Sequence, residues 1–161
     1  VFTYHHNDPE AYLPIIVSIL DTGLNCTDTL VAPAEMSASL HISGTGSSIV
    51  DSIFVCRDAD NELSEPLEEL VIPVAELREG GVDPSEGDLE CIILGHLARR
   101  TIDSLRGDWN SNAPTATKID KARTELDRVI TDYPISELVN RIRQASADHR
   151  QDGQAVQGGP D

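Results

Sequence analysis

The sequence predicts a mixed α/β fold in which strands and one helix precede a helical region. Residues 1–58 alternate between strand-like runs and one apolar pattern of helical spacing. Residues 83–145 carry three amphipathic patterns, each bounded by helix start or stop signals. We therefore expect sheet elements in 1–58, an acidic linker with a short extended segment in 59–82, a helical subdomain in 83–145 and a disordered tail in 146–161.

The first predicted element is a strand over residues 1–6, VFTYHH, in which successive side chains point to opposite faces. A helix over 9–21 should follow, because Asp8 is a good N-cap and Pro9 suits the first helical position. Gly23 is the expected helix stop. The apolar stripe of this helix has i, i+3, i+4, i+7 spacing and consists of Leu13, Ile16, Val17 and Leu20.

Two further strands are expected at 24–33 and 49–56, separated by a small, polar loop. That loop contains Gly-x-Gly in SGTGSS (43–48), but it lacks the longer dinucleotide fingerprint and any Gly-Lys-Ser/Thr. We interpret it as a connection between strands rather than a phosphate cradle.

The second part begins with the acidic stretch 58–69, followed by LVIPVAEL (70–77), a short strand or extended docking segment. The first helix pattern should be capped by Asp83 or Ser85 and stopped by Gly107. A second pattern lies in 115–133, and Pro134 opens a third. Three such helices with short joints suggest a small helical packing unit.

The charge is strongly negative. Asp and Glu total 28 against 12 Lys and Arg, for a net charge of -16, and Lys118 and Lys121 are the only lysines. This balance favours a halophilic protein, because molar salt shortens the Debye length to ~3 Å and screens self-repulsion. An ordinary acidic protein is the alternative. No apolar run approaches the ~20 residues of a membrane helix, and we expect a cytoplasmic protein without a membrane partner.

The three cysteines, Cys26, Cys56 and Cys91, are widely spaced and form no Cys-x-x-Cys pair. Zinc-ribbon and redox-pair motifs are therefore absent, and we expect reduced, buried thiols. No Gly-x-Ser-x-Gly elbow occurs that would support a serine hydrolase.

The most informative residues are His5, His6 and Asn7, at the carboxyl end of the first strand. Adjacent strand residues point to opposite faces, so the two histidines do not chelate one ion through a regular strand. One interpretation is structural, with one histidine packed and the other solvated. The other is a place on the rim of a binding site, since ligands of open α/β sheets bind beyond the carboxyl strand ends.

The order of motifs resembles the closing portion of adenine-specific DNA methyltransferases, in particular the group associated with phage defence. The stretch VFTYHHNDPEAY is followed by a small-residue-Gly turn, a strand leading to Pro and Glu, Ser-Ser, and a strand ending in Cys-Arg. The resemblance covers residues 1–58, about a third of the chain. The matching residues are Phe2, Thr3, His5, His6, Asp8, Pro9, Glu10, Ala11, Gly23, Pro33, Glu35, Ser47, Ser48, Cys56 and Arg57.

The resemblance implies a Rossmann-like sheet of seven strands that binds S-adenosylmethionine and acts on DNA. Residues 1–6 would be its fifth strand, 9–21 the following helix and 24–57 the closing antiparallel pair. The catalytic tetrapeptide Asp-Pro-Pro-Tyr and the Gly-rich cofactor loop are absent from this sequence. Both normally lie upstream, so no catalytic or cofactor-binding residues are assigned here.

The resemblance therefore implies the C-terminal fragment of a restriction-modification or phage-defence enzyme. It would be inactive without its catalytic half, supplied by a longer chain or a separately encoded partner. The histidines would border the site, and we expect His6 to matter more because it is nearest the strand-to-helix turn. The alternative is a noncatalytic protein-interaction module, suggested by the lack of a self-contained catalytic set.

The isolated chain should be unstable at low salt. A fifth strand normally pairs with a fourth, so residues 1–6 should expose an apolar edge. Losing a few hundred Å² of apolar contact at ~25 cal/mol per Å² costs several kcal/mol, which is comparable to a domain's stability. We expect aggregation or partial melting at low salt and compaction in molar salt. Circular dichroism and light scattering across a salt series test this, and a cooperative melt of a low-salt monomer would contradict it.

Overall fold

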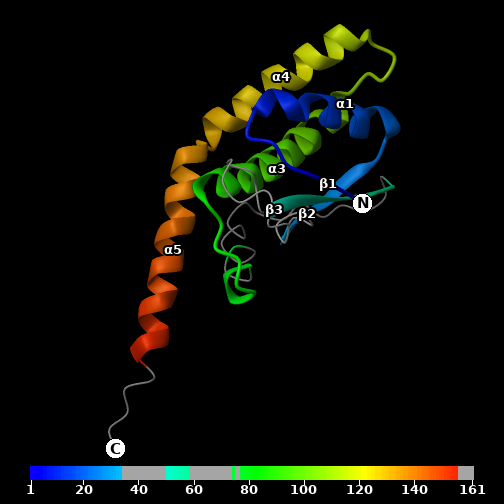
Figure 1. Ribbon diagram of the computed structural model, residues 1–161. Coiled ribbons are helices and arrows are strands. Elements are labelled where there is room, and N and C mark those ends of the chain that lie inside the picture. The colour runs from blue at the N-terminus through cyan, green and yellow to red at the C-terminus, as the bar shows by residue number, and fades with distance from the viewer. Residues whose placement is uncertain (34–49, 59–73, 75–76, 156–161) are drawn as a thin grey trace, which may run out of the picture.

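The computed structural model describes residues 1–33, 50–58, 74 and 77–155, with side chains up to residue 145. Within these ranges it has a mixed α/β architecture, in which helices lie on one face of a small antiparallel sheet (Figure 1). The elements in chain order are β1 (Phe2–Tyr4), the 3₁₀ helix η1 (Pro9–Tyr12), α1 (Leu13–Thr22), β2 (Asn25–Pro33), β3 (Val50–Arg57), α3 (Glu86–Leu105), the 3₁₀ helix η4 (Arg106–Asp108), α4 (Thr115–Asp132) and α5 (Ile135–Ala155).

The sheet has the order β1-β3-β2, and β3 is antiparallel to both of its neighbours. The strands β1 and β2, which α1 connects, therefore run in the same direction with β3 inserted between them. The expected antiparallel pair of closing strands is present. Among the described residues no strand pairs with the outer edge of β1, where Val1 is 82% and Phe2 37% exposed.

The strand β1 is shorter than the predicted 1–6, because the chain leaves the sheet after Tyr4. The following turn begins η1, where the Asp8 carboxylate accepts a hydrogen bond from the Glu10 N–H at 3.0 Å. Pro14 lies in the first turn of α1 and has no N–H to donate, so the predicted helix starts as a 3₁₀ turn. It ends at Gly23, whose φ of 73° is left-handed, as predicted.

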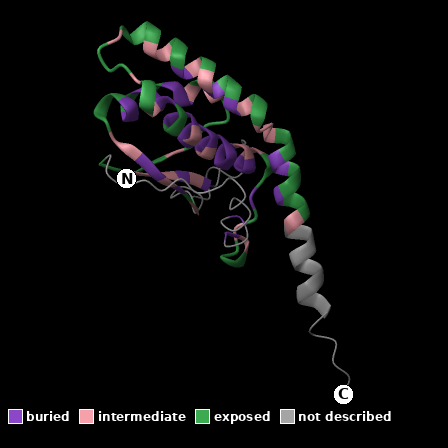
Figure 2. Ribbon diagram, turned by 180° about the vertical axis from the view of Figure 1, so that it is seen from behind, coloured by how far each residue is buried: buried purple, intermediate pink, exposed green. Residues whose placement is uncertain are grey.

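The central helix α3 is capped by Ser85, one of the two residues, Asp83 or Ser85, that were expected to cap it. The Ser85 hydroxyl accepts from the Asp88 N–H, and the Asp88 carboxylate accepts from the Ser85 N–H, forming a capping box. The helix packs on β2 and β3 on one side and against α1, α4 and α5 elsewhere. It is therefore buried over most of its circumference, while α4 keeps an exposed outer face (Figure 2).

Two apolar clusters meet at α3. The first cluster joins α1, α4 and one half of α3 to the sheet residues Cys26 and Phe54. The second joins the N-terminal half of α3 to the end of α4, to α5, and to Val50, Val74 and Leu77. The apolar stripes predicted for 9–21 and for the three later helices supply most of these buried side chains, and the helical region packs directly on the sheet.

Two sequence predictions are wrong within the described residues. Val74 and Leu77, which belong to the segment 70–77 that was expected to be extended, are helical. Val74 and Leu77 are both buried in the second cluster, so packing outweighs the β-propensity at these two positions. The helix α5 continues to Ala155, where a disordered tail was expected from 146. Residues 146–155 lack proline, and the helix propagates through them despite Gly153.

Some predictions fall outside the described residues. These are Glu35, the loop with SGTGSS, which includes Ser47 and Ser48, the acidic linker over 59–69, and the last part of the tail. In the part of the chain that is described, no helix combines the length and apolar character needed to cross a membrane.

Candidate functional site

His5 lies at the carboxyl end of β1 and pairs with Asp51 of β3. The cross-strand partners Thr3↔Ile53 and Tyr4↔Ser52 place position 5 opposite Asp51 in register. The His5 Nδ1 atom makes a short contact with Asp51 Oδ1, and the two side chains are 43% and 18% exposed. Alternation places this pair on the sheet face opposite the helices, because Tyr4 points towards Tyr12 in the core.

His6 has a different environment. Its Nδ1 atom accepts a hydrogen bond from the Asp8 N–H at 2.9 Å, so the ring caps the turn between β1 and η1. The backbone of His6 is held by Tyr12, whose hydroxyl lies 3.3 Å from the His6 nitrogen and 3.2 Å from its carbonyl oxygen. The Tyr12 hydroxyl also lies 3.4 Å from the Cys91 carbonyl, and burial raises the Tyr12 pKa, which keeps the phenol neutral.

Asn7 is directed towards α3. Its Oδ1 atom accepts from the Cys91 thiol, and its Nδ2 atom lies 3.1 Å from where a Cβ would stand on Gly87. The absence of a side chain at Gly87 thus lets the Asn7 amide approach the first turn of α3.

The three residues predicted for a site rim therefore point in three directions. His5 lies on the sheet face opposite the described helices, His6 closes a turn, and Asn7 packs on α3. The rings of His5 and His6 are both oriented through Nδ1, and neither Nε2 atom has a hydrogen-bond partner among the described residues, but the His5 ring is oriented by a carboxylate. Asp51 fixes the Nδ1 proton, which leaves Nε2 as an acceptor while the ring is neutral. Sequence reasoning did not identify Asp51, because the two residues are 46 positions apart.

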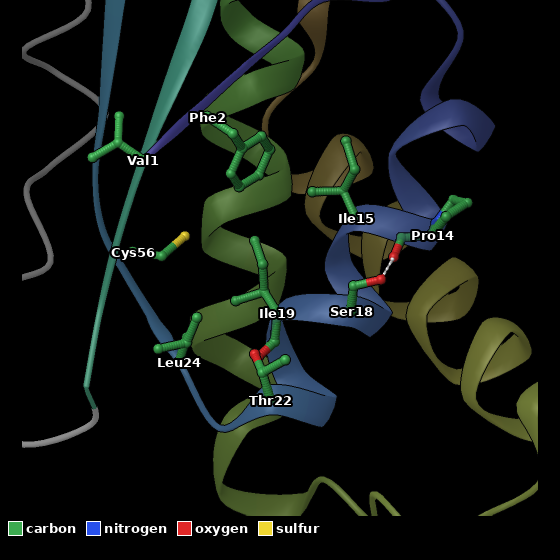
Figure 3. Close-up of a pocket in the computed structure, with 9 residues that line it drawn as sticks. All are labelled: Val1, Phe2, Pro14, Ile15, Ser18, Ile19, Thr22, Leu24 and Cys56. Carbon is green, nitrogen blue, oxygen red and sulfur yellow. Dashed lines mark hydrogen bonds between the residues drawn. The ribbon is translucent and has the colours of Figure 1, made fainter.

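A separate apolar pocket of about 460 Å³ lies between α1 and the sheet (Figure 3). It is on the helix side of the sheet and so is separated from His5 by the thickness of the sheet. The signal for it was present in α1, where Ile15 and Ile19 add apolar positions beyond the main stripe. The pocket is lined by Val1, Phe2, Pro14, Ile15, Ser18, Ile19, Thr22, Leu24 and Cys56.

The pocket does not fit S-adenosylmethionine. That cofactor carries an amino-acid carboxylate and ammonium, and none of the lining side chains is charged or an amide. Within the described ranges, no group of three or more His, Cys, Asp or Glu side chains gathers as metal ligands do.

Comparison with known proteins yields no relative: no family model, no curated protein and no solved structure matches this chain.

Proposed function

We propose that this chain is the C-terminal part of an adenine-specific DNA methyltransferase, inactive without an upstream catalytic half. The topology of the sheet carries the proposal. A strand, a connecting helix and a second strand in the same direction are closed by an antiparallel strand inserted between them. These are the elements that the resemblance implies, in the implied order, for the end of a Rossmann-like methyltransferase sheet.

The outer edge of β1 supports the same proposal. An exposed apolar strand edge invites pairing with another strand, and Val1 and Phe2 are the most exposed large apolar residues at this edge. A fourth strand from the upstream half would pair here. That half would also supply Asp-Pro-Pro-Tyr and the Gly-rich loop, so S-adenosylmethionine binding and methyl transfer belong to it.

The contribution of this chain to DNA binding would be the His5–Asp51 pair. An enzyme that methylates a base must take that base out of the stack, which leaves phosphates and base edges near the site rim. His5 Nε2 can accept a hydrogen bond when neutral, or donate one to a phosphate when protonated. The position of His6 next to the strand-to-helix turn favours His6 for this role. The contacts favour His5, because its ring is oriented by the Asp51 carboxylate, whereas the ring of His6 caps its own turn.

The test is methyl transfer from labelled S-adenosylmethionine to DNA by the enzyme that contains both halves. We expect His5→Ala and Asp51→Asn each to lower kcat/KM about tenfold, which corresponds to ~1.4 kcal/mol for one lost hydrogen bond. His6→Ala is the matched control. It should leave the rate near that of wild type at temperatures where its melting transition shows the protein folded.

Two results would contradict these proposals. Wild-type rates for both His5→Ala and Asp51→Asn would remove the pair from the site rim. Separately, the DNA that precedes the codon for Val1 should encode Asp-Pro-Pro-Tyr in the same frame or in an adjacent gene. A genuine start codon at that point with no methylase sequence nearby would reject the methyltransferase assignment and favour an interaction module.

A further inference from the structure

Two of the three cysteines are brought together by the sheet. Cys26 of β2 and Cys56 of β3 are direct cross-strand partners, although 30 positions separate them in the sequence. Directly opposed residues of an antiparallel pair have Cα atoms ~4.5–5.5 Å apart and side chains on the same face. The whole of this range of Cα–Cα distances lies inside the ~4.4–6.8 Å that a disulfide requires.

The surroundings of the two thiols differ. Cys26 is 2% exposed, and its thiol donates to the Asp28 carbonyl at 3.4 Å, next to the bulge that shifts the register between Cys26 and Asp28. Cys56 is half-buried and its side chain points into the apolar pocket beside α1 (Figure 3). A small uncharged reagent that enters this pocket therefore meets Cys56, whose cross-strand partner Cys26 does not line the pocket.

We propose that Cys26 and Cys56 are a peroxide-sensitive thiol pair, in which Cys56 is oxidised through the apolar pocket and Cys26 resolves it to a cross-strand disulfide. This inference does not depend on the proposed methyltransferase function.

The reaction balances with hydrogen peroxide as the oxidant. The Cys56 thiolate attacks one peroxide oxygen, forming an S–O bond as the O–O bond breaks, and the leaving hydroxide takes a proton to become water. The Cys26 thiolate then attacks the sulfenic sulfur, forming the S–S bond as the S–O bond breaks, and a second water leaves. Two thiols lose two electrons in all, and one peroxide is reduced to two waters.

The reaction should accelerate with pH. Burial raises the pKa of both thiols, that of Cys26 to about 12, and for Cys56 hydrogen bonding with Cys26 opposes the rise only in part. Because the thiolate is the nucleophile, the rate should increase with pH between pH 7 and pH 9. The pair is thus expected to be reduced at rest and to respond only to sustained oxidant.

The linkage can be mapped on the whole chain in molar salt. After peroxide treatment and alkylation of the remaining thiols, a protease that cuts after glutamate separates residues 11–35 from 36–62, because Glu10, Glu35 and Glu62 flank them. We expect these two peptides to be recovered as one disulfide-linked species that reduction splits. Cys91 should be recovered alkylated, since it lies on α3 and contacts Asn7.

Variants distinguish the roles of the two thiols. Cys91→Ser should keep the linkage, whereas Cys26→Ala should abolish it and leave a Cys56 sulfenic acid that dimedone traps. Recovery of Cys26 and Cys56 as separately alkylated peptides from peroxide-treated wild type would overturn the proposal. A linkage to Cys91, or one found only between two chains on non-reducing electrophoresis, would overturn it as well.

Discussion

Replacing Gly95 with alanine should destabilise the protein by about 1–3 kcal/mol, although alanine normally favours a helix interior by up to ~1 kcal/mol over glycine. Of the described glycines, Gly95 leaves the least room for a Cβ, because α3 lies close to the sheet at this position. A Cβ at this position would stand 2.7 Å from Ser52 Oγ, 3.0 Å from Ser52 Cβ and 3.5 Å from Thr29 Cγ2. The first contact requires the Ser52 side chain or the whole helix to move.

The Gly95 prediction is measured by urea unfolding at constant salt. Gly107→Ala is the matched control, because a Cβ there has nothing within 4 Å and should change the free energy of unfolding by less than ~1 kcal/mol. The double variant Ser52→Ala/Gly95→Ala should be less destabilised than the sum of the single variants, since it removes the closest clashing atom. Strict additivity, or a Gly95→Ala variant more stable than wild type, would show that the helix does not pack as closely as described.

Acidification should destabilise wild type more than a His96→Leu variant. His96 lies on α3, and its Nε2 atom is buried without a hydrogen-bond partner among the described residues. Desolvation, assisted by the nearby Arg99 guanidinium, lowers the pKa of His96 to about 4. The unfolded chain, with an imidazole pKa near its ordinary value of 6.5, then binds a proton that the folded chain does not.

The folded-state and unfolded-state pKa values of His96 set the pH range over which it changes the stability of the protein. Above pH 6.5 the imidazole is neutral in both states and contributes no pH dependence. As the pH falls from 6.5 to about 4, His96 lowers the free energy of unfolding by a growing amount, which levels off at about 3 kcal/mol at most. Burial raises the pKa of Asp103, which acts in the opposite sense, but this residue is common to both proteins and cancels in the comparison.

The His96 prediction is measured as the difference in free energy of unfolding between His96→Leu and wild type, at pH 7 and at pH 4.5. The difference should shift in favour of the variant at the lower pH. An equal loss of stability in both proteins would mean that the His96 ring is charged in the folded state at pH 4.5.

The sequence by itself determined where most helices and strands of this fold begin and end. Asp8 and Gly23 occupy the capping positions that were predicted for them, and Ser85 is one of the two caps, Asp83 or Ser85, that were expected for α3. A cap depends on hydrogen bonds and φ angles within a few residues. The two closing strands were predicted within one residue of their bounds, since strand propensity and turn residues are also local. The apolar stripes of the helices became the core for the same reason.

Only the tertiary structure decided which of these elements meet. The order β1-β3-β2 sets His5 against Asp51 and Cys26 against Cys56, and no spacing in the sequence encodes either pair. Packing also made Val74 helical and turned Gly95, which looks like an unfavourable helix residue in the sequence, into the contact point with the sheet. Register and close approach depend on residues dozens of positions apart, whereas propensity and capping act only within a single turn or strand.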